Sequence, residues 1–296
     1  MRIKKDKNRN EYINAGGIWV RNFTKYGVKP LNLSKLISKD DYYDIINNEA
    51  SNRTKNFPAI SEEKVHFKNI VIVSDGYNFD AKHKLLKNLP KDVAIIAVNR
   101  ALAKWTLTTS ANWRSINFYV VNNPYADCRR YQPRQHKYYP ACIASSKTDI
   151  EFLDKYHGSV YLYEATQEVG FGKSNVEKYC IDDYRNPICA AIGLAFQFGV
   201  EKLMLFCCDD SFSEERPAAE KLPNNLWTYP QHLISHKVID ANLYWLSHQE
   251  EVQVEICDHS SGPDYINANY ISEEVLIEFF IGQQNTQNMT GVIDEV

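Results

Sequence analysis

The chain has 296 residues, of which 44% are hydrophobic, 24% charged and 12% aromatic, a composition that excludes a disordered chain. Its formal net charge of −3 excludes a general basic field that would recruit nucleic acid. Its apolar runs fall far short of the roughly 20 residues that cross a bilayer, so we expect no transmembrane segment.

Cysteine usage and the first residues bear on the cellular compartment. The seven cysteines are odd in number, form no C-x-x-C pair and lie partly inside apolar runs. Such cysteines are typical of reduced, buried thiols and not of disulfides or a zinc site. Residues 1–7 are charged but have no apolar segment behind them, so we expect no signal peptide. The predicted compartment is the cytoplasm.

The first part of the chain differs in composition from the rest. Residues 1–66 are polar and mixed, and we predict that they form an N-terminal extension of a main domain at 67–296. Within this extension, the asparagine-rich stretch 47–56 is typical of a loop or linker.

In the main domain, short apolar runs alternate with helical patterns. The predicted strands are 69–73, 93–98, 116–121, 159–163, 202–207 and 252–257. The predicted helices are 81–89, 100–108, 148–156, 187–198, 234–248 and 272–281. Strands that alternate with helices form βαβ units with right-handed crossovers. The predicted fold class is therefore α/β: a Rossmann-like, mainly parallel sheet with helices on both faces, plus the N-terminal extension.

The strand at 69–73 is followed directly by Ser74, Asp75 and Gly76. An apolar run this short, closed by turn residues, indicates a strand buried on both faces of a parallel sheet. Ligands of open α/β sheets bind beyond the carboxyl ends of such strands. Ser74, Asp75 and Gly76 are therefore the first candidate site residues.

Short polar residues also follow three later strands, namely Asn99, Asn123 and Asp209. Each alone could be no more than a turn. Together, amides and carboxylates suit the base, ribose and phosphate of a nucleotide, because amides donate and accept hydrogen bonds and carboxylates accept them. Neither a G-x-G-x-x-G fingerprint nor a Walker A motif is present, which disfavours ordinary NAD and P-loop sites.

The helix at 187–198 has clear signals at both ends. Asn186 suits the N-cap, Pro187 the first helical position and Gly199 the position just after the helix. The N-terminus would offer free amides and a partial positive charge to an anion. Because the carboxylate of Asp75 would repel a phosphate, we expect the phosphate near Asn186, and ribose, base or metal at Asp75.

Four short motifs occur in order along the main domain. They are Ile-Val-Ser-Asp-Gly at 72–76, Ala-Val-Asn-Arg-Ala-Leu at 97–102, Val-Asn-Asn-Pro at 121–124 and Phe-Gly-Val-Glu-Lys-Leu-Met-Leu-Phe-Cys-Cys-Asp at 198–209. This succession resembles the uncharacterised-domain family of the motility accessory factors and the archaeal 6-hydroxymethylpterin pyrophosphokinase. It also resembles the bacterial lipooligosaccharide sialyltransferases, which share that Rossmann-like core. The resemblance is remote and covers residues 67–281.

The resemblance implies that several positions bind a nucleotide. In the sialyltransferases, the positions matched by Asn99 and Asn123 hold a cytidine monophosphate sugar. The full set of matched positions is Asp75, Gly76, Asn99, Asn123, Arg185, Asn186 and Asp209. The chain departs from the family at Gly76-Tyr-Asn-Phe79, which replaces Gly-Pro-Ser-Leu, at Cys207, which replaces a glycine, and at 211–213, which lack the phosphate-binding tyrosines. These departures concern the identity of the donor more than the fold.

A late helix carries the candidate base, His236, which resembles the histidine that heads a helix in the sialyltransferases and acts there as general base. Helical periodicity turns the apolar residues of this helix toward the core and leaves His236 on the opposite face, with Asp240 one turn away. A neighbouring carboxylate orients an imidazole and suits it to remove a hydroxyl proton. The alternative is a solvent-facing helical histidine, and the weaker rivals are His232, His248 and His259.

Two further features leave alternatives open. The stretch 128–140 places basic side chains among aromatic ones, which fits an acceptor clamp, a single-strand nucleic-acid patch or a solvated loop. The acidic overall charge makes nucleic acid the least favoured partner. The pair Asp209 and Asp210 could bind Mg²⁺ together with phosphates, or could simply end a strand.

The leading hypothesis is a glycosyltransferase that uses a nucleotide-activated sugar, such as a CMP-linked nonulosonic acid, and a glycan or protein acceptor. His236 would be the base, and the reaction would need neither a metal nor another cofactor. The first alternative is a pterin or nucleotide pyrophosphokinase that holds Mg²⁺ at Asp209 and Asp210. The second is a non-catalytic binding or assembly module on the same fold. The sequence is compatible with a homo-oligomer and does not determine one.

Overall fold

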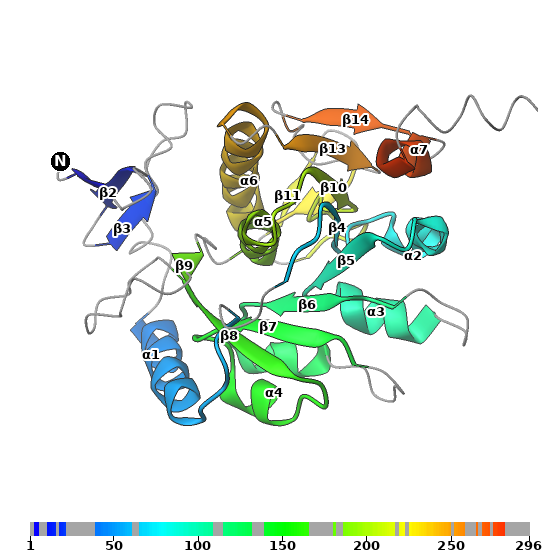
Figure 1. The fold of residues 1–296 in the computed structure, drawn as a ribbon. Coiled ribbons are helices and arrows are strands. Elements are labelled where there is room, and N and C mark those ends of the chain that lie inside the picture. The colour runs from blue at the N-terminus through cyan, green and yellow to red at the C-terminus, as the bar shows by residue number, and fades with distance from the viewer. Residues whose placement is uncertain are drawn as a thin grey trace, which may run out of the picture.

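The computed structural model describes residues 3–5, 11–15, 18–21, 39–60, 65–108, 115–131, 139–165, 180–181, 186–216, 219–222, 225–249, 252–257, 265, 268–272 and 275–281. Nine strands form one sheet in the order β14-β13-β10-β4-β5-β6-β7-β8-β9, and every pairing in it is parallel (Figure 1). The strands are β4 (Asn69–Val73), β5 (Val93–Val98), β6 (Phe118–Val121), β7 (Ala141–Ser145), β8 (Val160–Ala165), β9 (Cys180–Ile181), β10 (Lys202–Phe206), β13 (Gln253–Cys257) and β14 (Asn269–Ile271). The predicted Rossmann-like α/β fold is confirmed.

Helices cover both faces of this sheet. One face packs against α5 (Pro187–Gln197) and α6 (Pro230–Gln249). The other face packs against α2 (Phe79–Lys82), η4 (His83–Asn88), α3 (Ala101–Thr108), η5 (Ala126–Tyr131), α4 (Ile150–Asp154) and α7 (Leu276–Ile281). In β4, Ile70 and Ile72 face the first layer while Val71 and Val73 face the second, and all four are fully buried. Burial on both faces is the reason that this strand is apolar at successive positions.

Strand prediction succeeded where the apolar run was continuous. The bounds of β4 and β5 coincide with the predicted 69–73 and 93–98. In contrast, β7 was missed, because its sequence, Ala-Cys-Ile-Ala-Ser, contains only one β-branched residue and follows the basic stretch at once. Prediction also merged α2 and η4 into one helix at 81–89, and began α7 four residues too early.

The asparagine-rich stretch at 47–56, predicted to be a loop, belongs mostly to α1 (Lys39–Thr54), so this prediction is wrong. Asn48 and Asn52 lie one turn apart on the helix. Asn52 Nδ2 donates to the carbonyl oxygens of Ser146 at 2.9 Å and Thr148 at 2.7 Å, and Asn48 Nδ2 donates to that of Pro124 at 2.8 Å. These distant contacts override the weak helix propensity of asparagine.

The rest of the N-terminal extension contains a separate antiparallel sheet of β1 (Ile3–Lys5), β2 (Glu11–Ala15) and β3 (Ile18–Arg21). The boundary at residue 66 stays a prediction. Among the described helices, we find none with the length and apolar character needed to cross a membrane.

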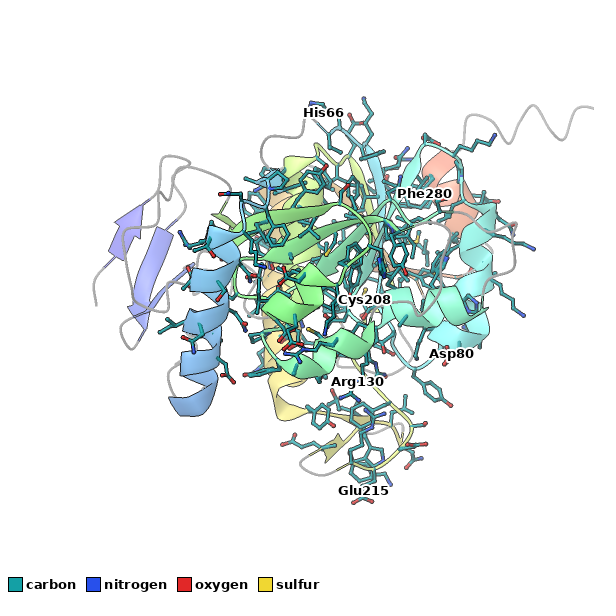
Figure 2. All side chains as sticks on the ribbon, turned by 90° about the horizontal axis from the view of Figure 1, so that it is seen from below. His66, Asp80, Arg130, Cys208, Glu215 and Phe280 are labelled. Carbon is teal, nitrogen blue, oxygen red and sulfur yellow. The ribbon has the colours of Figure 1, made fainter. Side chains whose placement is uncertain are left out.

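The order of the strands defines a switch point between β4 and β10. From β4 the chain proceeds through β5 to β9 on one side, and then returns to β10 on the other side. In Figure 2, His66, which precedes β4, lies at one edge of the sheet. Asp80, Arg130 and Glu215, which follow β4, β6 and β10, lie at the opposite edge. This carboxyl edge at the switch point is where open α/β sheets bind ligands.

Candidate functional site

The loops that follow β4 and β10 lie in direct contact. Ser74 N donates to the carbonyl oxygen of Phe206 at 3.1 Å, and Gly76 N donates to that of Cys207 at 3.0 Å. A Cβ atom on Gly76 would overlap Asp209 Oδ1 and lie 2.5 Å from the Cys207 carbonyl oxygen. Gly76 is therefore required because the two loops approach so closely, and this contact brings the predicted residues Ser74, Gly76 and Asp209 together.

Asp75 is neutralised by cations on the neighbouring element. Its Oδ2 accepts from Arg100 Nε at 2.8 Å and lies 4.0 Å from Lys104 Nζ. The pKa of Arg100 is raised above its ordinary value, chiefly by the charge of Asp75. Asp75 thus acts here as a partner for Arg100, whereas we had expected it to face ribose, base or metal.

The two predicted asparagines at this edge differ in their bonding. Asn99 adopts a left-handed backbone conformation with a φ of 45°, and its buried Oδ1 has no hydrogen-bond partner among the described residues. Asn123 holds a turn, because its Oδ1 accepts from Tyr125 N at 2.8 Å and its Nδ2 donates to Asp127 Oδ1 at 3.0 Å. The Asn99 oxygen therefore differs from Asn123, whose side chain already has two local partners.

The basic stretch 128–140 uses its first arginine for structure. Arg129 binds both carboxylate oxygens of Asp149, at 2.9 and 2.8 Å, and Asp149 also caps α4 by accepting from Phe152 N. Burial alone would raise the pKa of Asp149, but the hydrogen bonds from Arg129 and Phe152 outweigh it and lower this pKa below its ordinary value. Residues 132–138 of the stretch lie outside the described residues.

The predicted ends of α5 are confirmed, and its N-terminus lies beside a carboxylate. Asn186 Oδ1 accepts from Ile188 N at 2.8 Å, and Pro187 has no N–H to offer. Asn186 Nδ2 lies 3.4 Å from the carboxylate of Asp210, which therefore already occupies the positive end of the helix. Gly199 follows the helix with a φ of 76°. Arg185 lies outside the described residues.

Two histidines near the start of α6 bind the loop after β10. His236 Nε2 lies 3.1 Å from the Asp209 carbonyl oxygen, and His232 Nδ1 lies 3.1 Å from the Asp210 carbonyl oxygen. Because a carbonyl oxygen only accepts, each of these nitrogens carries the hydrogen. In the neutral form of each ring, the lone pair is therefore on Nδ1 in His236 and on Nε2 in His232.

The surroundings of the two histidines differ. His236 is 4% exposed, and its ring stacks on the buried ring of Tyr265 at 4.9 Å. The prediction that it lies on the helix face opposite the core is wrong, because the β10 loop and Tyr265 cover that turn of α6. His232 is half-buried, and its ring meets Tyr229 edge-on at 5.4 Å. Asp240 is half-buried one turn after His236, and its catalytic role stays a prediction.

Sequence reasoning missed three contributors to this edge: Arg100, Lys104 and Tyr265. His232 was named only as a rival, although its spacing of four residues from His236 places both rings on one side of α6. No sequence pattern around Tyr265 indicated that it belongs to this edge. Its hydroxyl donates to the Cys208 carbonyl oxygen at 2.9 Å across 57 residues of sequence.

Asp209 and Asp210 were the candidates for a metal site. Within the described parts of the chain, no group of three or more His, Cys, Asp and Glu residues is placed to hold a metal ion. The Asp210 carboxylate accepts a hydrogen bond from Asn186 Nδ2 at 3.4 Å.

Comparison with known proteins gives a structural similarity only. No family model matches the chain, and no curated protein matches it. The fold is similar to that of the MAf glycosyltransferase from Magnetospirillum magneticum AMB-1, with a TM-score of 0.57 and 16% sequence identity. The match covers 79% of this chain but 39% of the other, so this chain spans well under half of that protein.

Proposed function

We propose that the protein is a glycosyltransferase that moves a sugar from a nucleotide-activated donor, of the CMP-linked nonulosonic acid class, to a hydroxyl group of a glycan or protein acceptor. In support, its core is similar in fold to part of the MAf glycosyltransferase. The observation that carries the proposal is the orientation of His232 at the switch point. Its Nδ1–H is fixed on the Asp210 carbonyl oxygen, which leaves Nε2 as a base at the ligand edge.

In this reaction His232 Nε2 takes the proton of the acceptor hydroxyl. The acceptor oxygen forms a bond to the anomeric carbon of the donor, while the bond from that carbon to the phosphate oxygen breaks. The nucleotide leaves with the negative charge on its phosphate. A ring nitrogen held by a carbonyl fixes the tautomer, which is what a general base requires. The scheme uses no metal ion.

His236 takes a positioning role in this proposal, although its sequence context suggested the base. Its lone pair is on the buried Nδ1 side of the ring, and its Nε2–H holds the Asp209 carbonyl. It therefore fixes the loop that orients His232. The loop carries Asp209 and Asp210 next to Gly76, where donor and acceptor would meet.

The test is transfer from a CMP-activated sugar by three matched variants of α6. His232→Gln should reduce kcat by about 100-fold or more while donor affinity stays unchanged, since general-base catalysis contributes about 10²–10⁴. His236→Gln should chiefly reduce stability. His248→Gln, which changes an exposed histidine of the same helix, should have no effect. Unchanged turnover in His232→Gln would remove the proposed base.

The same preparation separates the alternatives. Transfer that survives complete chelation with EDTA excludes the Mg²⁺-dependent pyrophosphokinase, whereas ATP consumption that requires Mg²⁺ would favour it over transfer. A binding module without a nucleotide site would gain no thermal stability from CMP, UDP, GDP or ATP, because only a bound ligand raises the free energy of unfolding.

A further inference from the structure

We propose that Arg100, supported by Lys104, forms the subsite that holds the phosphate of the nucleotide, at the ends of β4 and β5 and not at the N-terminus of α5. This inference rests on the proposed use of a nucleotide donor. It reverses the expectation from sequence, which assigned the phosphate to Asn186 because Asp75 carries a negative charge.

The Arg100 side chain is oriented by the protein and still open to a ligand. Its Nε donates to Asp75 Oδ2 at 2.8 Å, and Asp75 is itself 16% exposed, so this contact is sheltered from solvent. The two terminal nitrogens of Arg100 have no hydrogen-bond partner among the described residues, and the side chain is 43% exposed. A guanidinium fixed along one edge can offer the other edge to two phosphate oxygens at once.

Lys104 adds a second cation on the same side of α3, since it follows Arg100 by one helical turn. Its Nζ lies 3.4 Å from Asp80 Oδ2 and 3.5 Å from the Asp75 carbonyl oxygen. The ammonium also lies 5.7 Å from the centre of the Phe79 ring, so α2 and the β4 loop fix its position. The helix α3 begins at Ala101, which places the positive end of its dipole beside Arg100.

The N-terminus of α5 lacks these properties. One backbone amide is capped by Asn186 and another is missing at Pro187. A phosphate placed there would meet the carboxylate of Asp210, whose contact with Asn186 Nδ2 is 3.4 Å long. Like charges a few ångströms apart repel strongly in a partly buried site. At the β4–β5 edge, in contrast, the carboxylate of Asp75 is already matched by Arg100.

The experiment is a comparison of nucleotide with nucleoside. Isothermal titration measures the affinities for CMP and cytidine, with UDP and uridine and GDP and guanosine in parallel, for the full chain and for Arg100→Gln. The variant should lower the affinity for the phosphorylated ligand by about 10-fold or more, the typical effect of a charged hydrogen bond. The affinity for the matching nucleoside should not change.

Two further variants are controls for misfolding and for a general effect of losing an arginine at this edge. Arg100→Lys keeps a charge beside Asp75 and should fold like the wild type in a thermal melt. It should nevertheless lose part of the phosphate increment, which is the gain in affinity of the nucleotide over the matching nucleoside. Arg130→Gln removes another arginine at this edge, whose Nε donates to the Asp127 carbonyl oxygen, and should change neither affinity (Figure 2).

The outcomes of this experiment distinguish failure of the Arg100 subsite from failure of the proposed function. An equal loss for nucleotide and nucleoside, or no loss for either, overturns the Arg100 subsite and leaves the proposed function standing. An Arg100-dependent phosphate increment without any sugar transfer supports the subsite and removes the glycosyltransferase proposal. Failure of the wild type to bind any of these nucleotides overturns both.

Discussion

Two regions of the carboxyl edge are built by different means. At the ends of β4 to β7, charged side chains pair with each other, as in Asp75 with Arg100 and Asp149 with Arg129. At the end of β10, an imidazole N–H and a phenol hydroxyl donate to main-chain carbonyl oxygens, as His236 does at Asp209 and Tyr265 does at Cys208. The first arrangement leaves paired charges partly exposed, and the second holds the loop after β10 in a fixed geometry.

Burial explains why the two regions differ. His236 and Tyr265 are 4% and 2% exposed, and an ionised side chain would be costly to bury there. The arginines of the first region keep 43% and 39% of their side chains exposed, so water still solvates their charge. We therefore expect pH to act on the first region and loss of single hydrogen bonds to act on the second.

The largest expected effect is at Gly76, where the two regions touch. Gly76→Ala should lower the free energy of unfolding by about 3 kcal/mol, because the new methyl group overlaps Asp209 Oδ1. The control is Gly199→Ala, where the added Cβ has room and only the positive φ is strained, at about 1 kcal/mol. Urea unfolding measures both, and equal losses would show that the loops can move apart.

A smaller effect should follow from Tyr265→Phe. Removal of the hydroxyl leaves the buried Cys208 carbonyl oxygen without this donor, which should cost about 1–3 kcal/mol of unfolding free energy. Tyr77→Phe, in a tyrosine that is 48% exposed, is the matched control and should be neutral. Urea unfolding at low and high salt checks the result, since a neutral hydrogen bond should respond little to salt. A loss of unfolding free energy that disappears in high salt would show that charge, and not this hydrogen bond, stabilises the second region.

The first region should respond to acid through Asp149. The pKa of this carboxylate is lowered in the folded protein, so its stabilising contribution is present above the ordinary value of 3.8 and is lost as the pH falls below that value. Asp149→Asn keeps an N-cap for α4 but removes the charge. Wild type should be more stable than this variant at pH 7, and the difference in urea unfolding should shrink progressively as the pH falls below 3.8. A constant difference would show that the Arg129 pair contributes nothing.

The smallest effect is expected at Cys207, which has a φ of 52°. In Cys207→Gly, relief of the left-handed strain should offset the lost side chain and the greater freedom of the unfolded chain, so that stability changes by less than about 1 kcal/mol. Cys208→Gly should cost more, because Cys208 has no such strain and its thiol contacts the Ile72 carbonyl oxygen. Thermal melts of both variants decide, and a larger loss at Cys207 would contradict this reading.

Local sequence determined the central strands of the sheet and the ends of α5. The apolar runs at 69–73 and 93–98 can be satisfied only by strands buried on both faces, and the cap signals at Asn186, Pro187 and Gly199 act within one or two turns of helix. Because parallel strands share an edge, the convergence of Ser74, Asn99 and Asp209 at the switch point also followed from the sequence.

Tertiary structure decided the partners of these residues, because each partner comes from a distant part of the chain. Asp75 meets Arg100 across 25 residues, and Asn186 meets Asp210 across 24. Their charges and lone pairs are therefore assigned only when the strands pair. The same holds for His232 and His236, whose tautomers depend on which carbonyl oxygen each ring faces. The sequence placed polar residues at one edge of the sheet, and the fold determined which partner each of them has.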